Sequence, residues 1–289
     1  MFKTIDIAFH PVHATYWRLT PVRLPDYTFT NLFAWSEGHR LSWREQANLL
    51  WLKRIDSENV FWAPLGDWEN ADWADILPSF APGTVFERVP ERLIAKLEAL
   101  FPGRFAVEET PEEWDYLYEQ PKLATLSGSK LHKKKNHWNA FIKTYGEDFR
   151  VLGPLDIPLV KAFEAAWYAA REDRDSPAIT NENRAVMKAL DHFEAIGGLA
   201  LGGLFHEDRL IAFSLGEPLD ERTFMVHFEK GLPEYRGVYQ AINLAFAREF
   251  GKGYALINRE QDSGSEGLRQ AKRSYYPVAF GVKNRLRLL

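Results

Sequence analysis

The spacing of apolar residues in the first third of the chain predicts alternating helices and strands. Residues 24–35 begin with a Pro-Asp helix-start signal and continue with apolar residues at roughly helical spacing. Two short apolar runs, 48–53 and 60–65, are separated by a turn-rich segment, which predicts a β-hairpin. Residues 90–100 carry leucine and isoleucine on one helical face, and 105–108 are expected to form a short strand. The predicted order is therefore helix, hairpin, helix, strand.

The same order of elements recurs in the second half of the chain. Two apolar runs, 198–205 and 210–217, flank a polar turn and predict a second hairpin, and a third strand is expected at 223–229. This recurrence predicts two copies of one α/β unit. The other elements expected here are helices at 158–170, 183–196, 237–250 and 266–274, a strand at 254–258, and a closing strand or pair at 278–288.

A strongly basic helix is expected between the two copies, at residues 126–145. It carries lysines and no acidic residue between Lys130 and Lys143, whereas an ordinary exposed helix mixes both signs of charge. We expect it to bind phosphate or another anion; the alternative is a solvated helix face. The candidate anion-binding residues are Lys133, Lys134, Lys135 and Asn136. The domain boundary is placed here, which gives an N-terminal domain at 1–125 and a C-terminal domain at 126–289.

Composition narrows the chemistry open to the protein. The sequence contains 0 Cys, which excludes disulfides, thiol nucleophiles, Cys-ligated zinc and iron–sulfur clusters. The formal net charge of -4 argues against a basic protein that wraps nucleic acid. The most apolar stretch, 195–205, is shorter than the roughly 20 residues that a transmembrane helix needs. We expect no metal site and a cytoplasmic location, with peripheral contact to a membrane surface left open. The oligomeric state is not predicted.

Two further segments place polar residues where a strand gives way to a helix. Arg236 and Gly237 open one helix, with Tyr239 in its first turn, and offer a cation and unpaired backbone N–H groups to an anionic ligand. After the next strand, Asn258 begins a dense polar loop, and the following helix carries Arg269. Ligands of open α/β sheets collect beyond the carboxyl ends of strands, so we expect these residues to bind the anion too. The alternative for the loop is a capped helix start.

These elements carry a resemblance to a known family. A strand hairpin, a further strand, an Arg-Gly turn into a helix, a strand and a final helix resemble the GNAT-type acyltransferase fold. Several stretches between residues 213 and 272 look like a bacterial family grouped with the C-terminal domain of phosphatidylglycerol lysyltransferases, which carry two GNAT-like units. The resemblance covers essentially the whole chain. It implies an α/β (α+β) fold of two GNAT-like units, each a mixed, mostly antiparallel sheet flanked by helices. The stretches that carry it are FSLGE at 213–217, HFEKG at 227–231, YRG at 235–237, NREQDSG at 258–264 and GLRQAK at 267–272.

The resemblance also implies an activity. An acyl or aminoacyl group would move from an activated donor, either aminoacyl-tRNA or acyl-CoA, to a nucleophilic acceptor such as a phospholipid headgroup. Lys272 falls at the lysine of the lysyltransferases' Leu-Arg-x-x-Lys helix, and that lysine helps to stabilise the reacting ester. Tyr239 departs from the GNAT phosphate-binding turn, in which a small residue stands at that position.

Transfer chemistry needs a base, a cation and a proton donor. Glu229 at a buried strand end is the first candidate for a general base, and Asp262 is the second. Lys272, Arg236 or Arg269 would hold the oxyanion or the donor phosphate. The resemblance implies that Tyr275 protonates the leaving group, because GNAT enzymes often use a tyrosine near this place; the alternative is a packed aromatic residue before Pro277.

A second hypothesis comes from a different functional class. The chain would be a non-catalytic binding protein of the same fold that recognises RNA or a lipid headgroup through the basic helix. The transferase hypothesis requires Glu229, Asp262 and Lys272 to converge, with Lys272 meeting Asp262 in the resting state. We also expect the basic helix to border the same site as Arg236.

Overall fold

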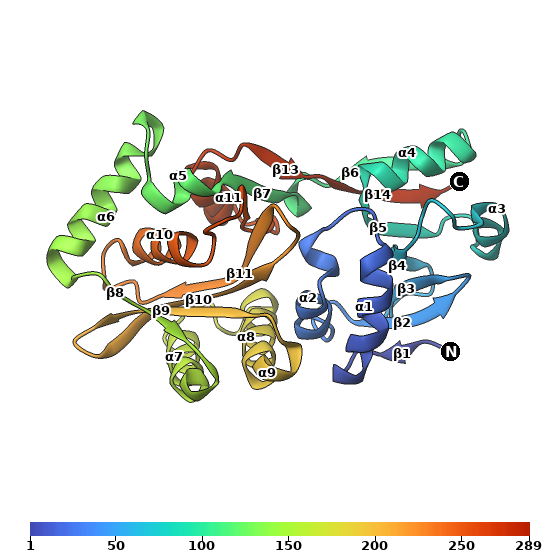
Figure 1. The fold of residues 1–289 in the computed structure, drawn as a ribbon. Helices are drawn as coiled ribbons and strands as arrows, with labels where there is room; N and C mark the ends of the chain where they lie inside the picture. The colour runs from blue at the N-terminus through green and yellow to red at the C-terminus, as the bar shows by residue number, and fades with distance from the viewer. The chain divides into compact units, whose positions relative to one another are not determined.

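The computed structural model describes residues 1–289 and divides into two compact units. The first comprises Met1–Trp114 together with Gly281–Leu289, and the second comprises Asp115–Phe280. Each unit is built around one seven-stranded sheet with helices packed against it (Figure 1). The predicted α+β fold of two units with mixed, mostly antiparallel sheets is confirmed.

The first unit contains the following helices (α), short 3₁₀ helices (η) and strands (β), in chain order: β1 (Lys3–Thr4), η1 (Ile7–Phe9), α1 (His10–Leu19), η2 (Pro25–Tyr27), α2 (Phe29–Ala34), β2 (Leu41–Gln46), β3 (Leu49–Arg54), β4 (Val60–Gly66), α3 (Trp73–Ile76), η3 (Leu77–Ser79), β5 (Val85–Pro90), α4 (Glu91–Leu100), β6 (Phe105–Glu109), η4 (Pro111–Glu113) and β14 (Lys283–Leu288).

The second unit contains β7 (Asp115–Glu119), α5 (Gln120–Thr125), η5 (Ser129–Leu131), α6 (His132–Tyr145), β8 (Asp148–Leu152), η6 (Pro154–Asp156), α7 (Ile157–Ala169), α8 (Pro177–Asp191), α9 (Phe193–Ile196), β9 (Ala200–His206), β10 (Arg209–Pro218), β11 (Thr223–Gly231), α10 (Val238–Glu249), β12 (Leu256–Asn258), α11 (Glu266–Arg273) and β13 (Ala279–Gly281).

The two sheets have the same strand arrangement. The first sheet runs β1-β2-β3-β4-β5-β14-β6, and the second, read in the same sense, runs β8-β9-β10-β11-β12-β7-β13. In each sheet four antiparallel strands are followed by one parallel step, β4 with β5 and β11 with β12. The repeated order of elements seen in the sequence therefore reflects a repeated topology.

The chain exchanges one strand between the two sheets, so the units do not divide at the expected position. Strand β7 pairs with β12 in the second sheet, and β14 pairs with β5 and β6 in the first. The division by contacts therefore differs from the expected ranges 1–125 and 126–289. Residues 115–125 belong to the second unit and the last nine residues to the first. The physical reason is that the hydrogen-bond partners of a strand are set by the whole sheet and not by the strand's own residues: β7 lies between β13 and β12, and β14 lies between β5 and β6.

Each sheet opens after its parallel step. Strand β11 pairs with β12 only from Thr223 to Met225, although β11 continues to Gly231. Strand β4 pairs with β5 only from Val60 to Trp62 and continues to Gly66. Beyond these last pairs the two neighbouring strands separate, and polar side chains occupy the space between them.

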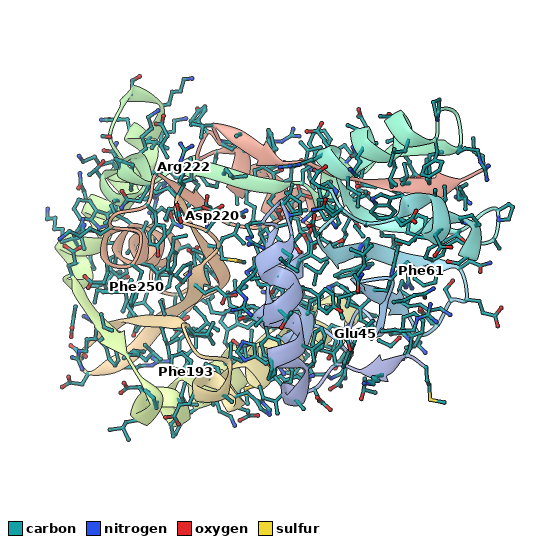
Figure 2. The ribbon with its side chains drawn as sticks, turned by 45° about the vertical axis from the view of Figure 1, so that its right-hand side comes forward. Glu45, Phe61, Phe193, Asp220, Arg222 and Phe250 are labelled. Atoms are coloured by element: carbon teal, nitrogen blue, oxygen red, sulfur yellow. The ribbon has the colours of Figure 1, made fainter.

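Helices cover both faces of the second sheet. Helix α10 packs on β10 and β11 and also contacts α5 and α6, while α7 contacts β10 from the other face and packs against α8 (Figure 1). Phe250 lies just beyond α10 and is labelled in Figure 2. Its ring stacks on Phe224 of β11, and its centroid lies 4.8 Å from that of Phe246. These aromatic contacts anchor α10 to the sheet on the face where the candidate site lies.

Most of the expected elements are present, with differences at their ends. The helix expected at 24–35 is divided into η2 and α2, because Thr28 is extended and caps α2 by accepting the N–H of Asn31. The hairpin strands β3 and β4 pair as expected, and β2 extends the ladder on the far side of β3. The closing pair is β13 and β14, which lie in different sheets.

A buried ion cluster lies at the opening of the first sheet. The carboxylate of Asp26 accepts hydrogen bonds from Arg88 and from Lys283, whose side chain is fully buried. Burial alone would raise the pKa of Asp26, but the two cations lower it to about 2. Tyr27 donates its hydroxyl to the carbonyl of Arg88 at 3.1 Å. In this unit, the buried charges at the opening therefore compensate one another.

The Asp26 cluster yields a stability prediction. Asp26→Asn removes the shared carboxylate of two buried cations, and we expect a loss of about 3–5 kcal/mol in the free energy of unfolding at pH 7. Asp56→Asn, in an exposed ion pair with Arg54, should cost far less, because water and salt screen an exposed pair. Urea unfolding measures both. The Asp26 contribution is present above the pKa of the unfolded chain, 3.8, and disappears as the pH falls through about 2. Equal losses in the two variants would contradict this account.

Candidate functional site

The opening between β11 and β12 holds a buried carboxylate–guanidinium pair. Glu229 on β11 accepts a hydrogen bond from Arg259 Nη2 at 3.0 Å through Oε1 and from Asn243 Nδ2 at 3.1 Å through Oε2. The side chains of Glu229 and Arg259 are only 11% and 13% exposed. Arg259 follows the last residue of β12, and Asn243 lies on α10. Three elements therefore converge on one carboxylate at the point where the strands separate.

Two buried polar atoms beside Glu229 have no hydrogen-bond partner. They are Nη1 of Arg259, a donor, and Oδ1 of Asn243, an acceptor. Because more than nine in ten buried polar groups in proteins are hydrogen-bonded, such atoms call for an explanation. A ligand that offers one acceptor and one donor next to Glu229 would satisfy both.

Two aromatic rings and a second cation complete the cluster. The guanidinium of Arg259 lies 5.0 Å from the ring centroid of Tyr275 and 5.9 Å from that of Tyr118. Lys134 of α6 places its Nζ 4.5 Å from the centroid of Tyr275. Burial, and secondarily the charge of Arg259, lowers the pKa of Lys134. Burial also raises the pKa of Tyr275 to about 12, so its phenol keeps its proton at neutral pH.

Lys272 is fixed by backbone carbonyls and does not meet Asp262. Its ammonium donates to the carbonyls of Arg259 at 2.7 Å, Glu260 at 3.1 Å, and Gln261. Burial lowers its pKa to about 8, with the charge of Arg259 adding to the effect. The expected resting contact with the Asp262 carboxylate was wrong. All three protons of the ammonium are used in holding the segment after β12 against α11.

Asp262 is also occupied by structural partners. Its side chain is 1% exposed and accepts hydrogen bonds from Tyr116 Oη at 2.7 Å, from the backbone N–H of Gly264, and from two nitrogens of Arg269. Burial alone would raise the pKa of Asp262, but the bonds from Arg269 and Tyr116 lower it. Each oxygen of Asp262 already accepts two hydrogen bonds, which makes this carboxylate a weak proton acceptor, whereas each oxygen of Glu229 accepts one. Asp262 and Arg269 neutralise each other at the start of α11.

The turn before α10 is occupied by the protein itself. Gly237 has φ +94, and a Cβ at this position would lie 2.9 Å from the carbonyl oxygen of His137 in α6. Glycine is therefore needed because α6 approaches the turn, whereas we had expected a ligand there. Tyr239 donates its hydroxyl to the carbonyl of Gly231 at 3.2 Å, and the side chain of Arg236 is exposed.

The basic helix contributes one lysine to the cluster. Lys134 reaches Tyr275, and Lys130 lies 5.3 Å above the ring of Tyr276. Lys133 and Asn136 are exposed, and Lys135 is partly buried. Asn258, by contrast, is buried and accepts the N–H of Glu260 at 2.8 Å, so it shapes the loop. Among the predicted site residues, the structure thus brings together Glu229, Tyr275 and Lys134, with Lys272 anchoring the backbone next to them.

A buried histidine escaped the sequence analysis. His227 Nε2 lies 2.8 Å from Glu217 Oε1, and Nδ1 lies 3.0 Å from Glu260 Oε1. Burial alone would lower the pKa of His227, but the two carboxylates raise it to about 9. Arg259 and Asn243 were also missed. Of these residues, Arg259 alone could have been found from the sequence, because it is a charged residue directly after a strand.

The His227 bridge predicts a pH dependence of stability. Its folded-state pKa of about 9 exceeds the 6.5 of an unperturbed histidine. Its contribution is therefore fully present below pH 6.5 and is lost as the pH rises through 9. We expect the stability difference between wild type and His227→Gln to shrink by about 3 kcal/mol from pH 6 to pH 10. Chemical denaturation at each pH measures it. His137→Gln, at an exposed histidine, is the control. A difference that stays constant with pH for His227→Gln would mean that folding leaves the pKa of this ring unchanged.

Two proteins are 32% identical in sequence to this chain. A solved protein of unknown function from Bacteroides thetaiotaomicron is 32% identical, with 100% of this chain and 99% of that chain covered and a TM-score of 0.88. An uncharacterised protein of Mycoplasmoides gallisepticum is 32% identical over 167 residues, and the match spans 56% of this chain and about half, 52%, of that protein.

More distant solved structures share the fold. L-PGS from Bacillus licheniformis is 11% identical with a TM-score of 0.67, covering 99% of this chain and 93% of that chain. The C-terminal domain of a putative lysylphosphatidylglycerol synthetase from Agrobacterium fabrum is 12% identical with a TM-score of 0.64, covering 98% and 92%. None of the helices has the length and apolar character needed to cross a membrane.

The predicted family relationship is confirmed over nearly the whole chain. Residues 17–282 match the family model described as the C-terminal part of phosphatidylglycerol lysyltransferase. The chain belongs to the phosphatidylglycerol lysyltransferase C-terminal family.

Proposed function

We propose that the protein is an aminoacyl or acyl transferase whose transfer site is the Glu229 cluster, made of Glu229, Arg259, Asn243, Lys134 and Tyr275. The observation that carries the proposal is the buried Glu229 carboxylate, flanked by an unpartnered donor on Arg259 and an unpartnered acceptor on Asn243. Family membership supports group transfer as the class of reaction. The acceptor is a nucleophilic hydroxyl or amine.

The proposed step uses three groups of the cluster, Glu229, Arg259 and Tyr275. The acceptor's oxygen or nitrogen attacks the ester or thioester carbonyl of the donor, and Glu229 takes the proton that the acceptor loses. Arg259 Nη1 donates to the oxygen that becomes negative in the tetrahedral intermediate. When the bond to the leaving group breaks, Tyr275 gives its proton to the departing oxygen or sulfur. The tyrosine is then reprotonated from Glu229 or solvent, which restores the site.

The donor that the contacts favour is aminoacyl-tRNA. The turn that resembles the phosphate-binding turn for CoA faces the carbonyl of His137, and a carbonyl oxygen repels a phosphate. The cations near the cluster lie instead on α6, where Lys134 reaches Tyr275 and Lys133 is exposed. A polyanionic donor would lie along this helix with its reactive end at Glu229. Acyl-CoA remains the second donor to test.

Lys272 receives a positioning role in this proposal. The resemblance implies that it stabilises the reacting ester, but its three carbonyl contacts tie down the segment that carries Arg259. Asp262 and Arg269 hold the start of α11 in the same way. Direct action of these three residues on the donor stays a prediction.

The first test is transfer by wild type and by Glu229→Gln. Loss of the aminoacyl ester from charged tRNA, or release of the thiol from acyl-CoA, is followed with phosphatidylglycerol vesicles or an amine-bearing peptide as acceptor. We expect Glu229→Gln to slow transfer by about a hundredfold or more, because the base is lost while its shape remains. Glu249→Gln, exposed at the end of α10, is the matched control and should transfer at the wild-type rate.

The outcomes of this test separate the two functional classes. Transfer by Glu229→Gln at the wild-type rate would contradict the role of Glu229. Binding of tRNA by wild type without consumption of either donor would favour the alternative, a non-catalytic protein that recognises an anionic ligand.

The second test concerns the donor. Lys134→Met should weaken binding of aminoacyl-tRNA and reduce the slope of log affinity against log salt by about 1, because one phosphate contact is lost. Lys252→Met, an exposed lysine beyond α10, should leave the slope unchanged. Fluorescence anisotropy over a range of salt concentrations measures both. Identical slopes for wild type and Lys134→Met would exclude Lys134 from the donor site.

A further inference from the structure

The bridge Glu217–His227–Glu260 joins the body of the second sheet to the loop that carries Arg259. Glu217 lies on β10 opposite Met225 of β11, and His227 is the extra residue of a β-bulge in β11, between Val226 and Phe228, which pair with Gly216 and Leu215 of β10. Glu260 belongs to the segment that leaves β12 at the opening. His227 is therefore the one side chain of the bridge that contacts both the rigid ladder and the loop.

The loop is held in an uncommon backbone conformation. Glu260 has φ +54, a value that non-glycine residues seldom adopt and that persists only where the surroundings impose it. Its N–H donates to Asn258 Oδ1 at 2.8 Å, and its carbonyl accepts the N–H of Tyr116 at 3.2 Å and the ammonium of Lys272 at 3.1 Å. The carboxylate bonded to His227 is the remaining constraint. Main chain and side chain of Glu260 are thus both fixed.

The geometry favours a protonated ring between two ionised carboxylates. Both imidazole nitrogens lie within 3.0 Å of carboxylate oxygens, and only the imidazolium donates from both nitrogens. A neutral ring would turn one lone pair toward a carboxylate. The charge of His227 therefore keeps two partly buried acidic side chains on either side of it, and one of these determines the path of the loop.

We infer that His227 is a positioning residue that, through Glu260, sets the loop 258–262 and with it the guanidinium of Arg259 against Glu229. The consequence of this positioning for catalysis rests on the proposed function. The effect of His227 on the loop is independent of the proposed function, because it follows from the contacts alone.

The two carboxylates of the bridge provide a matched pair of variants. Glu217→Ala and Glu260→Ala each remove one partner of the same imidazole, and the two side chains are similarly exposed, 16% and 19%. Only Glu260 lies on the loop. His227→Phe keeps a ring and removes both bonds, and Glu260→Gln keeps an accepting oxygen and serves as the rescue variant.

The first readout is amide hydrogen exchange at Tyr116 and Arg259, whose N–H groups bond to the carbonyls of Glu260 and Tyr116 across the loop. We expect exchange about tenfold faster in Glu260→Ala and His227→Phe, near wild type in Glu217→Ala, and largely restored in Glu260→Gln. Equal acceleration in both alanine variants, or none in Glu260→Ala, would overturn the inference.

The second readout is transfer from aminoacyl-tRNA, measured per folded molecule. The rate should fall in Glu260→Ala and His227→Phe and hold in Glu217→Ala. A looser loop with an unchanged rate would overturn the positioning role. Absence of transfer in wild type would count against the proposed function only, and the exchange data would still decide whether His227 sets the loop.

Discussion

The structure of the second unit depends on a parallel strand pairing that stops early. Strands β11 and β12 share only the Thr223–Met225 pairing, and β11 then runs on with β10 alone. The gap beyond Met225 is filled with charged side chains, and a charge removed from water is tolerated only next to a partner. Arg259 therefore pairs with Glu229, and Lys272 is surrounded by carbonyls. The chemistry proposed for the site follows from this need for compensation.

The first unit also has a charged residue directly after its last parallel strand pair, but its partners differ. The last parallel pairs are Trp62 with Glu87 and Met225 with Asn258, and the next residue is an arginine in both units, Arg88 and Arg259. Arg88 is held with Lys283 on the Asp26 carboxylate, whose side chain is 6% exposed. In the second unit Arg259 holds the Glu229 carboxylate, and Lys134 of the basic helix lies beside Tyr275 next to this pair. The same position thus carries an arginine–carboxylate pair in both units, and the lysine from α6 is the reason why we place the transfer site in the second.

Local pattern predicted the elements better than their partners. Apolar runs and turn signals were enough to find the hairpin of β9 and β10, but nothing in residues 115–119 reveals that this strand belongs beside β12. The site shows the same limit. Glu229 and Tyr275 were found because a strand end and a family motif mark them. The His227 bridge was missed because its carboxylates come from β10 and from the loop after β12. Gly237 was recognised as special, but only the packed fold shows that α6 is what approaches it.

Neighbouring residues of β11 fix its register by opposite charges on opposite faces. Glu229 faces α10 and binds Asn243 of that helix and Arg259. Lys230 faces the other side of the sheet. Its Nζ lies 2.6 Å from a carboxylate oxygen of Glu182 and 3.9 Å from the ring centroid of Trp167. On that side Glu164 is fully buried, and burial raises its pKa to about 7, an effect that Lys230 opposes. A slip of one residue would exchange the two faces. The Glu229 carboxylate would then lie among acidic residues and Lys230 beside Arg259, so like charges would meet on both faces. The charges that serve the site on one face therefore also hold the strand in the register that the site requires.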